Sequence, residues 1–76
     1  RSMKFTGHPT NDPRVFDATA ETKTGLVLSV TGAPWRTVDI GASTEGSGVY
    51  IRMNPTEARA LAAQLVACCN AVGGEQ

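Results

Sequence analysis

The sequence has no excess of charge of either sign. Seven Lys and Arg residues balance seven Asp and Glu residues, and charged residues make up only 18% of the chain. No block of like charge occurs, so neither a basic nucleic-acid tail nor a membrane-surface helix is indicated. No apolar run approaches the roughly 20 residues that span a bilayer, and no signal peptide is recognisable. The expected location is therefore the cytoplasm.

Residues that bind metals or act as nucleophiles are also scarce. The two cysteines, Cys68 and Cys69, are neighbours in a predicted helix, where side chains point about 100° apart, so they cannot form a disulfide with each other. The only histidine, His8, is far from them in the sequence, and no serine lies in a nucleophile-elbow pattern. We therefore expect no metal site, no cofactor and no enzymatic activity.

The length of 76 residues predicts a single domain, 1–76. Arg1 and Ser2 precede Met3 and are interpreted as a cloning scar. Residues 3–14 contain two prolines beside Asn and Asp, which predicts an irregular N-terminal arm, although Lys4 to Thr6 could add an edge pairing. A chain this short buries only about 60% of its unfolded surface, so it needs help from a disulfide, a metal or a partner chain.

Alternation of apolar and polar residues predicts a sheet over residues 15–53. Four strands are expected, at 15–24, 26–31, 35–40 and 49–53. Trp35 stands at the start of the third strand, and Gly32-Ala33-Pro34 breaks the second. The segment 41–48, GASTEGSG, is predicted to be a flexible loop.

The sharpest local signal is Asn54-Pro55-Thr56-Glu57. Asn54 suits a helix N-cap, Pro55 suits the first helical position, and Glu57 has the spacing of a capping box. A helix is therefore predicted over 54–72, with Gly73-Gly74 as its stop. The predicted fold class is α+β, a four-stranded antiparallel meander followed by one C-terminal helix packed on the sheet (ββββα).

One apolar stripe of this helix is expected to cover the sheet. It consists of Ala58, Leu61, Ala62, Leu65, Cys69 and Val72. From Ala60 to Gly74 there is no charged residue, so the opposite side is small and uncharged as well. Alanine is tolerated anywhere in a helix, which would explain this side without a partner. We favour burial against a second chain, as a two-fold homodimer with the interface Ala60, Ala63, Gln64, Ala67, Cys68 and Ala71.

A family resemblance rests on the ββββα order, the run LVLSVTGAPW and the junction GVYIRMNPTEARALAAQL. Over about residues 26–65 these resemble the single-stranded-DNA-binding transcriptional coactivators of the positive-cofactor-four type. The resemblance implies a dimer through the helix and single-stranded-DNA binding by the sheet. The sequence departs from that family in the loop before the last strand, which carries a Glu and no Lys or Arg.

The leading functional hypothesis is a small non-enzymatic homodimeric binding protein that recognises a macromolecule or a small ligand through its sheet face and loops. By analogy of size and composition, it has the character of phage or mobile-element interaction or inhibitor proteins. The alternative is single-stranded nucleic-acid binding, because aromatic rings stack on bases and cations pair with phosphates. Ordinary cross-strand pairing would also explain the same side chains. The candidate contact residues are Trp35, Arg36, Tyr50, Arg52, Lys23 and Arg14.

Overall fold

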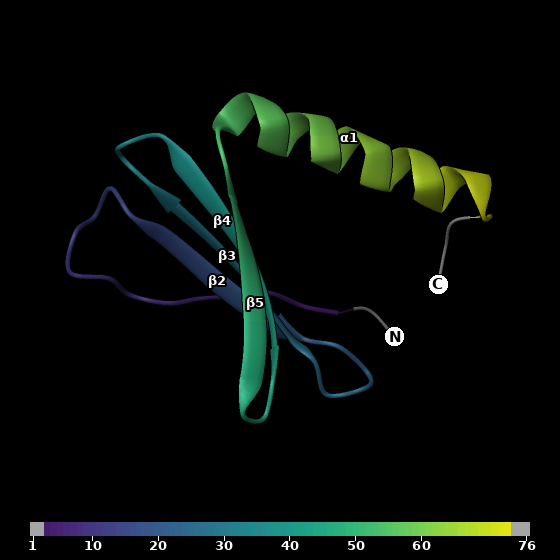
Figure 1. The fold of residues 1–76 in the computed structure, drawn as a ribbon, viewed down its shortest axis with the longest axis horizontal. Coiled ribbons are helices and arrows are strands. Elements are labelled where there is room, and N and C mark those ends of the chain that lie inside the picture. The colour runs from purple at the N-terminus through teal and green to yellow at the C-terminus, as the bar shows by residue number, and fades with distance from the viewer. Residues whose placement is uncertain (1–2, 74–76) are drawn as a thin grey trace.

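The computed structural model describes residues 3–73. The interpretation of Arg1 and Ser2 as a cloning scar, and the part of the helix stop assigned to Gly74, lie outside the described residues. Figure 1 shows an antiparallel sheet followed by one helix, which confirms the α+β class. The elements are β1 (Thr6–Gly7), β2 (Phe16–Glu21), β3 (Val27–Ala33), β4 (Thr37–Thr44), β5 (Ser47–Met53) and α1 (Pro55–Ala71). The strands lie in sequence order across the sheet.

The described sheet has five strands, so the prediction of four is wrong by one. The additional strand, β1, lies within the segment 3–14 that was expected to be irregular. Thr6 pairs with Thr19 and Gly7 with Ala18, and the His8 N–H then donates to the Asp17 carbonyl at 2.8 Å. A strand of two residues is too short to show a period of two in the sequence.

The segment 41–48 is a hairpin, so the prediction of a flexible loop over these residues is wrong. β4 continues to Thr44 and β5 begins at Ser47, so that only Glu45 and Gly46 form the turn, where Gly46 has a φ of 80°. Small residues are depleted in strands and therefore indicated a loop. Here they serve a close approach of the two strands, since a Cβ added at Gly48 would lie 2.9 Å from the Ser43 Cβ.

The turn between β3 and β4 also lies later than predicted. β3 continues through Ala33, and the turn consists of Pro34, Trp35 and Arg36, so Trp35 is not part of a strand. The Arg36 N–H donates to the Ala33 carbonyl at 3.1 Å, and Arg36 has a φ of 68°. A three-residue hairpin loop closed by a left-handed residue is one of the common hairpin geometries, usually with glycine in that place.

The strand register sorts the sheet into two faces. The apolar face carries Gly7, Phe16, Ala18, Ala20, Leu28, Val30, Gly32, Val38, Ile40, Ala42, Thr44, Ser47, Val49, Ile51 and Met53. The polar face carries Thr6, Asp17, Thr19, Glu21, Val27, Ser29, Thr31, Ala33, Thr37, Asp39, Gly41, Ser43, Gly48, Tyr50 and Arg52. The alternation in the sequence predicts this division for most of these residues.

The helix begins as the sequence predicts. The Asn54 Oδ1 accepts from the Glu57 N–H at 2.8 Å, and the Glu57 Oε1 accepts from the Asn54 N–H at 2.9 Å, which is a complete capping box. Pro55 occupies the first helical position, where its missing N–H is not needed. At the other end Val72 is the C-cap and Gly73 has a φ of 88°, so the predicted helix over 54–72 is confirmed with its caps.

The helix does not cover the sheet of its own chain, which corrects the predicted packing. No residue of α1 is buried, and only Pro55 and Ala58 are half-buried. Its contact with the sheet is confined mostly to β4, and Figure 1 shows it leaving the end of β5 and running away from the strands. Among the described residues the only buried apolar side chains are Ala18 and Ala20. Periodicity identifies an apolar side of each element but does not say which surface covers it.

Candidate functional site

The centre of the polar face is a row of paired side chains across β2 to β5. Asp17, Thr31, Asp39 and Arg52 are successive neighbours in the register. The Thr31 hydroxyl donates to the Asp17 Oδ1 at 2.9 Å. The Arg52 guanidinium donates to both carboxylate oxygens of Asp39, at 2.9 and 3.2 Å. These polar groups therefore bind one another and leave few hydrogen-bond donors and acceptors free for a ligand.

The ion pair between Arg52 and Asp39 shifts the pKa values of both groups. The hydrogen bonds from the Arg52 guanidinium hold the pKa of Asp39 below its ordinary value. The same hydrogen bonds raise the pKa of Arg52. Both side chains are in contact with solvent, so the pair contributes little to stability and is screened by salt.

The neighbouring row on the polar face ends in an exposed aromatic ring. Thr19, Ser29, Gly41 and Tyr50 follow one another across the strands, and Tyr50 is 66% exposed on the edge strand β5. A Cβ at Gly41 would lie 2.5 Å from the Ser29 Oγ, so there is little room for a side chain beside the ring. His8 adds a hydrogen bond of 2.7 Å between its Nε2 and the Thr19 hydroxyl. Tyr50 therefore offers a flat amphipathic contact surface.

The net charge of the polar face is negative. Its strand residues include three carboxylates, Asp17, Glu21 and Asp39, and one cation, Arg52, which gives −3 + 1 = −2. Nucleic-acid binding depends on cations that neutralise phosphates. This face therefore attracts a phosphate backbone poorly.

The structure brings only two of the six predicted contact residues together on the sheet, Tyr50 and Arg52. Arg14 lies before β2, where its guanidinium donates to Asp12 at 2.9 and 3.1 Å and holds the pKa of that carboxyl below its ordinary value. Lys23 lies in the turn between β2 and β3. These two residues therefore lie outside the strand rows of the polar face that hold Tyr50 and Arg52.

The other two predicted residues, Trp35 and Arg36, form the tip of the turn between β3 and β4. The turn is closed by the pair Ala33 and Thr37, at the end of the sheet where β5 meets the helix. Trp35 is 65% exposed, and Arg36 occupies the left-handed region that non-glycine residues rarely adopt. Exposed Trp and Arg in a constrained backbone suit protein recognition, because these residue types dominate binding hot spots.

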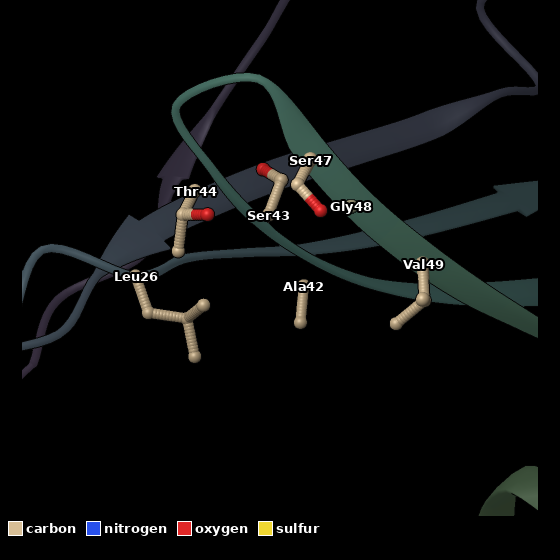
Figure 2. A pocket seen from close by; sticks show the side chains of 7 residues that line it. All are labelled: Leu26, Ala42, Ser43, Thr44, Ser47, Gly48 and Val49. Atoms are coloured by element: carbon tan, nitrogen blue, oxygen red, sulfur yellow. The ribbon is translucent and has the colours of Figure 1, made fainter.

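A shallow depression lies at the opposite end of the sheet, on the β4–β5 hairpin. Its volume is about 220 Å³, and it is lined by Leu26, Ala42, Ser43, Thr44, Ser47, Gly48 and Val49. Figure 2 shows Leu26, Ala42 and Val49 pointing to the same side of the sheet. The volume is below the roughly 300 Å³ of typical small-molecule pockets, so the depression is a part of the apolar face and not a separate cavity. The sequence analysis missed this depression, because it assigned residues 41–48 to a loop and therefore to neither face of the sheet.

The six residues predicted to form the dimer interface are all exposed in the single chain. They are Ala60, Ala63, Gln64, Ala67, Cys68 and Ala71, all on α1. Their pairing with a second chain stays a prediction. In residues 3–73 no three His, Cys, Asp or Glu side chains gather into a set that could hold a metal ion. Over the same residues no helix has the length and apolar character needed to cross a membrane.

Comparisons with known proteins give no match, either among protein-family models, among curated proteins or among solved structures.

Proposed function

We propose that this chain is a small non-enzymatic homodimeric binding protein that contacts another macromolecule through the tip of its β3–β4 turn and the polar face. The observation that carries the proposal is the exposure of Trp35 and Tyr50, at 65% and 66%. A large aromatic side chain left in water has unfavourable hydration that a partner surface would remove. The left-handed backbone conformation at Arg36 restricts the shape of the turn that carries Trp35.

A binding role is favoured over catalysis by the way the polar side chains are arranged. The carboxylates that lie near the centre of the polar face, Asp17 and Asp39, are engaged by Thr31 and Arg52. A general acid or base needs a shifted pKa and a site that excludes water. The hydrogen bonds between Asp39 and Arg52 lower the pKa of Asp39 and raise the pKa of Arg52, which suits a structural ion pair.

The homodimer is supported by the uncovered apolar surface of the single chain. Phe16, Val49 and Ile51 on the apolar face are 61%, 72% and 58% exposed, and Leu65 and Val66 on the helix are 58% and 60% exposed. Large exposed apolar side chains in this number are typical of a protein–protein interface. We expect sedimentation at micromolar concentration to give twice the 8.0 kDa mass of one chain.

Partner binding is tested by passing a host-cell lysate over the immobilised chain. The proteins that the chain retains are identified by mass spectrometry. Trp35→Ala and Tyr50→Ala should each weaken capture by about 30-fold or more, because truncation of a hot spot costs about 2 kcal/mol or more. Glu45→Ala is the matched control, since it removes an exposed side chain in a different turn that is not among the candidate contacts, and it should leave capture unchanged. Equal capture by all variants would contradict the proposed contact surface.

Single-stranded nucleic-acid binding is the second candidate, and the same exposed rings of Trp35 and Tyr50 favour it, because bases stack on aromatic side chains. The net charge of −2 on the polar face opposes it. Titration of a labelled oligonucleotide separates the two candidates. Binding at about 50 mM salt that weakens steeply at higher salt would favour the nucleic acid, since phosphate contacts are strongest at low salt.

A further inference from the structure

The apolar face of the sheet lacks a cover in the single chain. Apart from Gly7, Gly32, Thr44 and Ser47 at the margins and one strand end, its strand residues are Ala, Val, Leu, Ile, Met or Phe, and Phe16, Val49 and Ile51 are mostly in water. A sheet with one apolar face normally packs that face on a second layer. The depression beside Leu26, Ala42 and Val49 in Figure 2 extends this face to the β4–β5 turn. Some second layer is therefore required.

The helix has an apolar stripe that also lacks a cover. The stripe contains Leu61, Leu65 and Val72, which are 38%, 58% and 83% exposed. The helix has 17 residues and is about 26 Å long. Four spacings of about 4.8 Å between five strands give a sheet width of about 19 Å. One helix is therefore long enough to cross all five strands.

The connection between β5 and α1 prevents the helix from covering its own sheet. Asn54 is the only residue between Met53 and Pro55, and its backbone is extended, with φ −85° and ψ 167°. A residue before proline is restricted to such extended conformations. The two capping-box hydrogen bonds between Asn54 and Glu57 hold the same geometry. A helix that turned back onto its own apolar face would need a different backbone conformation at this junction.

The surface of the chain exceeds that of a compact monomer by an amount that fits a dimer interface. The accessible surface is 6054 Å², whereas a compact monomer of this mass has about 4,500 Å². When the five residues outside the described range are removed from the mass and about 160 Å² is subtracted for each, the excess is about 1,000 Å². A standard interface buries about 800 Å² per partner. The Cα radius of gyration, 13.6 Å, likewise exceeds the roughly 11 Å of a compact domain of this length.

We infer that the apolar face is covered by the C-terminal helix of a second copy, so that two chains exchange helices about a two-fold axis. The inference rests on the homodimer proposed above and adds which surfaces meet. Each chain gives its stripe and receives the stripe of the other, so the assembly closes at two copies. The stripe with Leu61 and Leu65 faces the partner's sheet, and the small stripe with Ala63 and Ala67 lies on the outer side of the helix or against the other helix.

The exchange is tested on the wild-type chain by isotope-filtered NOE spectroscopy. Uniformly labelled and unlabelled chains are unfolded, mixed and refolded together, so that half of the dimers are mixed and only contacts between chains give filtered signals. We expect signals between the Leu61 or Leu65 methyl groups of one chain and the Val49 or Ile51 methyl groups of the other. Sedimentation equilibrium on the same sample reports the oligomeric state separately.

Three other outcomes overturn the inference in distinguishable ways. A dimer whose filtered signals join only Ala63 and Ala67 across chains would show a helix-to-helix interface without exchange. A dimer in which Leu65 contacts Ile51 only within one chain would show that the helix folds back despite the Asn54 junction. A mass of one chain in sedimentation would refute the homodimer together with the exchange.

Discussion

Replacement of Leu65 by alanine should weaken the self-association of this chain by about 20- to 300-fold. Leu65 is 58% exposed in the single chain, so it has much apolar surface left to bury in a dimer. Full burial of a leucine side chain is worth about 1.5–3 kcal/mol, so the remaining 58% is worth about 0.9–1.7 kcal/mol. A two-fold dimer buries two copies of Leu65, so the variant should lose about 1.7–3.5 kcal/mol of dissociation free energy. At 1.4 kcal/mol per factor of ten, this loss corresponds to the stated change in the dissociation constant.

The change isolates association from helix formation. Leucine and alanine are both strong helix formers, so the helix content of the variant should match that of the wild type in far-ultraviolet circular dichroism. Sedimentation equilibrium over a range of concentrations then gives the dimer dissociation constant. Asn70→Ala is the matched control, because Asn70 is exposed on the same helix and lies about 120° from the centre of the stripe.

The reasoning would be refuted by a Leu65→Ala dissociation constant within twofold of the wild-type value. Leu65 would then remain in water in the assembly, and the stripe would not be part of an interface. A loss of affinity in Asn70→Ala that equals the loss in Leu65→Ala would instead place the interface on the small, polar side of the helix.

Three further changes test features of the sheet by urea unfolding. Arg36→Gly should stabilise the chain by about 0.5–1 kcal/mol, because glycine adopts a φ of 68° without the strain of a side chain. This figure is a net value, since the greater conformational entropy of glycine in the unfolded state offsets part of the gain. Gly48→Ala should destabilise it by about 1–2 kcal/mol, since the new Cβ would lie 2.9 Å from the Ser43 Cβ. Asp39 has a lowered pKa in the folded chain, so the stability it contributes is full above its unfolded pKa and is lost as pH falls through the folded value. The gap in urea midpoint between wild type and Asp39→Asn should therefore close as the pH falls below about 4, the ordinary pKa of an aspartate.

Each of these changes has a control or a contradicting outcome. Gly32→Ala places a Cβ at an ordinary 4.0 Å from the Phe16 Cβ and should cost less than Gly48→Ala. A loss of stability in Arg36→Gly would mean that the arginine side chain contributes more than its backbone strain removes. High salt should reduce the effect of Asp39→Asn at neutral pH, because the ion pair with Arg52 is exposed.

Part of the candidate surface follows from the sequence. The alternation in residues 49–53 places Tyr50 and Arg52 on one face, and the register confirms that they share it. The position of Trp35 and Arg36 at a turn tip does not follow, because β3 extends through Gly32 and Ala33, two residues that indicate a break when taken alone. The alternation already places Asp17 and Asp39 on the polar side of their strands, but only the register shows that they lie in one row with Thr31 between them.

The sequence by itself determines the helix and the sidedness of the strands. Asn54, Pro55 and Glu57 specify the helix start through hydrogen bonds that span only three residues, so no distant contact is needed. The tertiary structure decides the pairing of Thr6 and Gly7 with β2, the length of the β4–β5 hairpin and the direction in which the helix leaves the sheet. These features depend on hydrogen bonds and packing between segments far apart in the chain, and strand pairing can override the weak preferences of Gly and Ser.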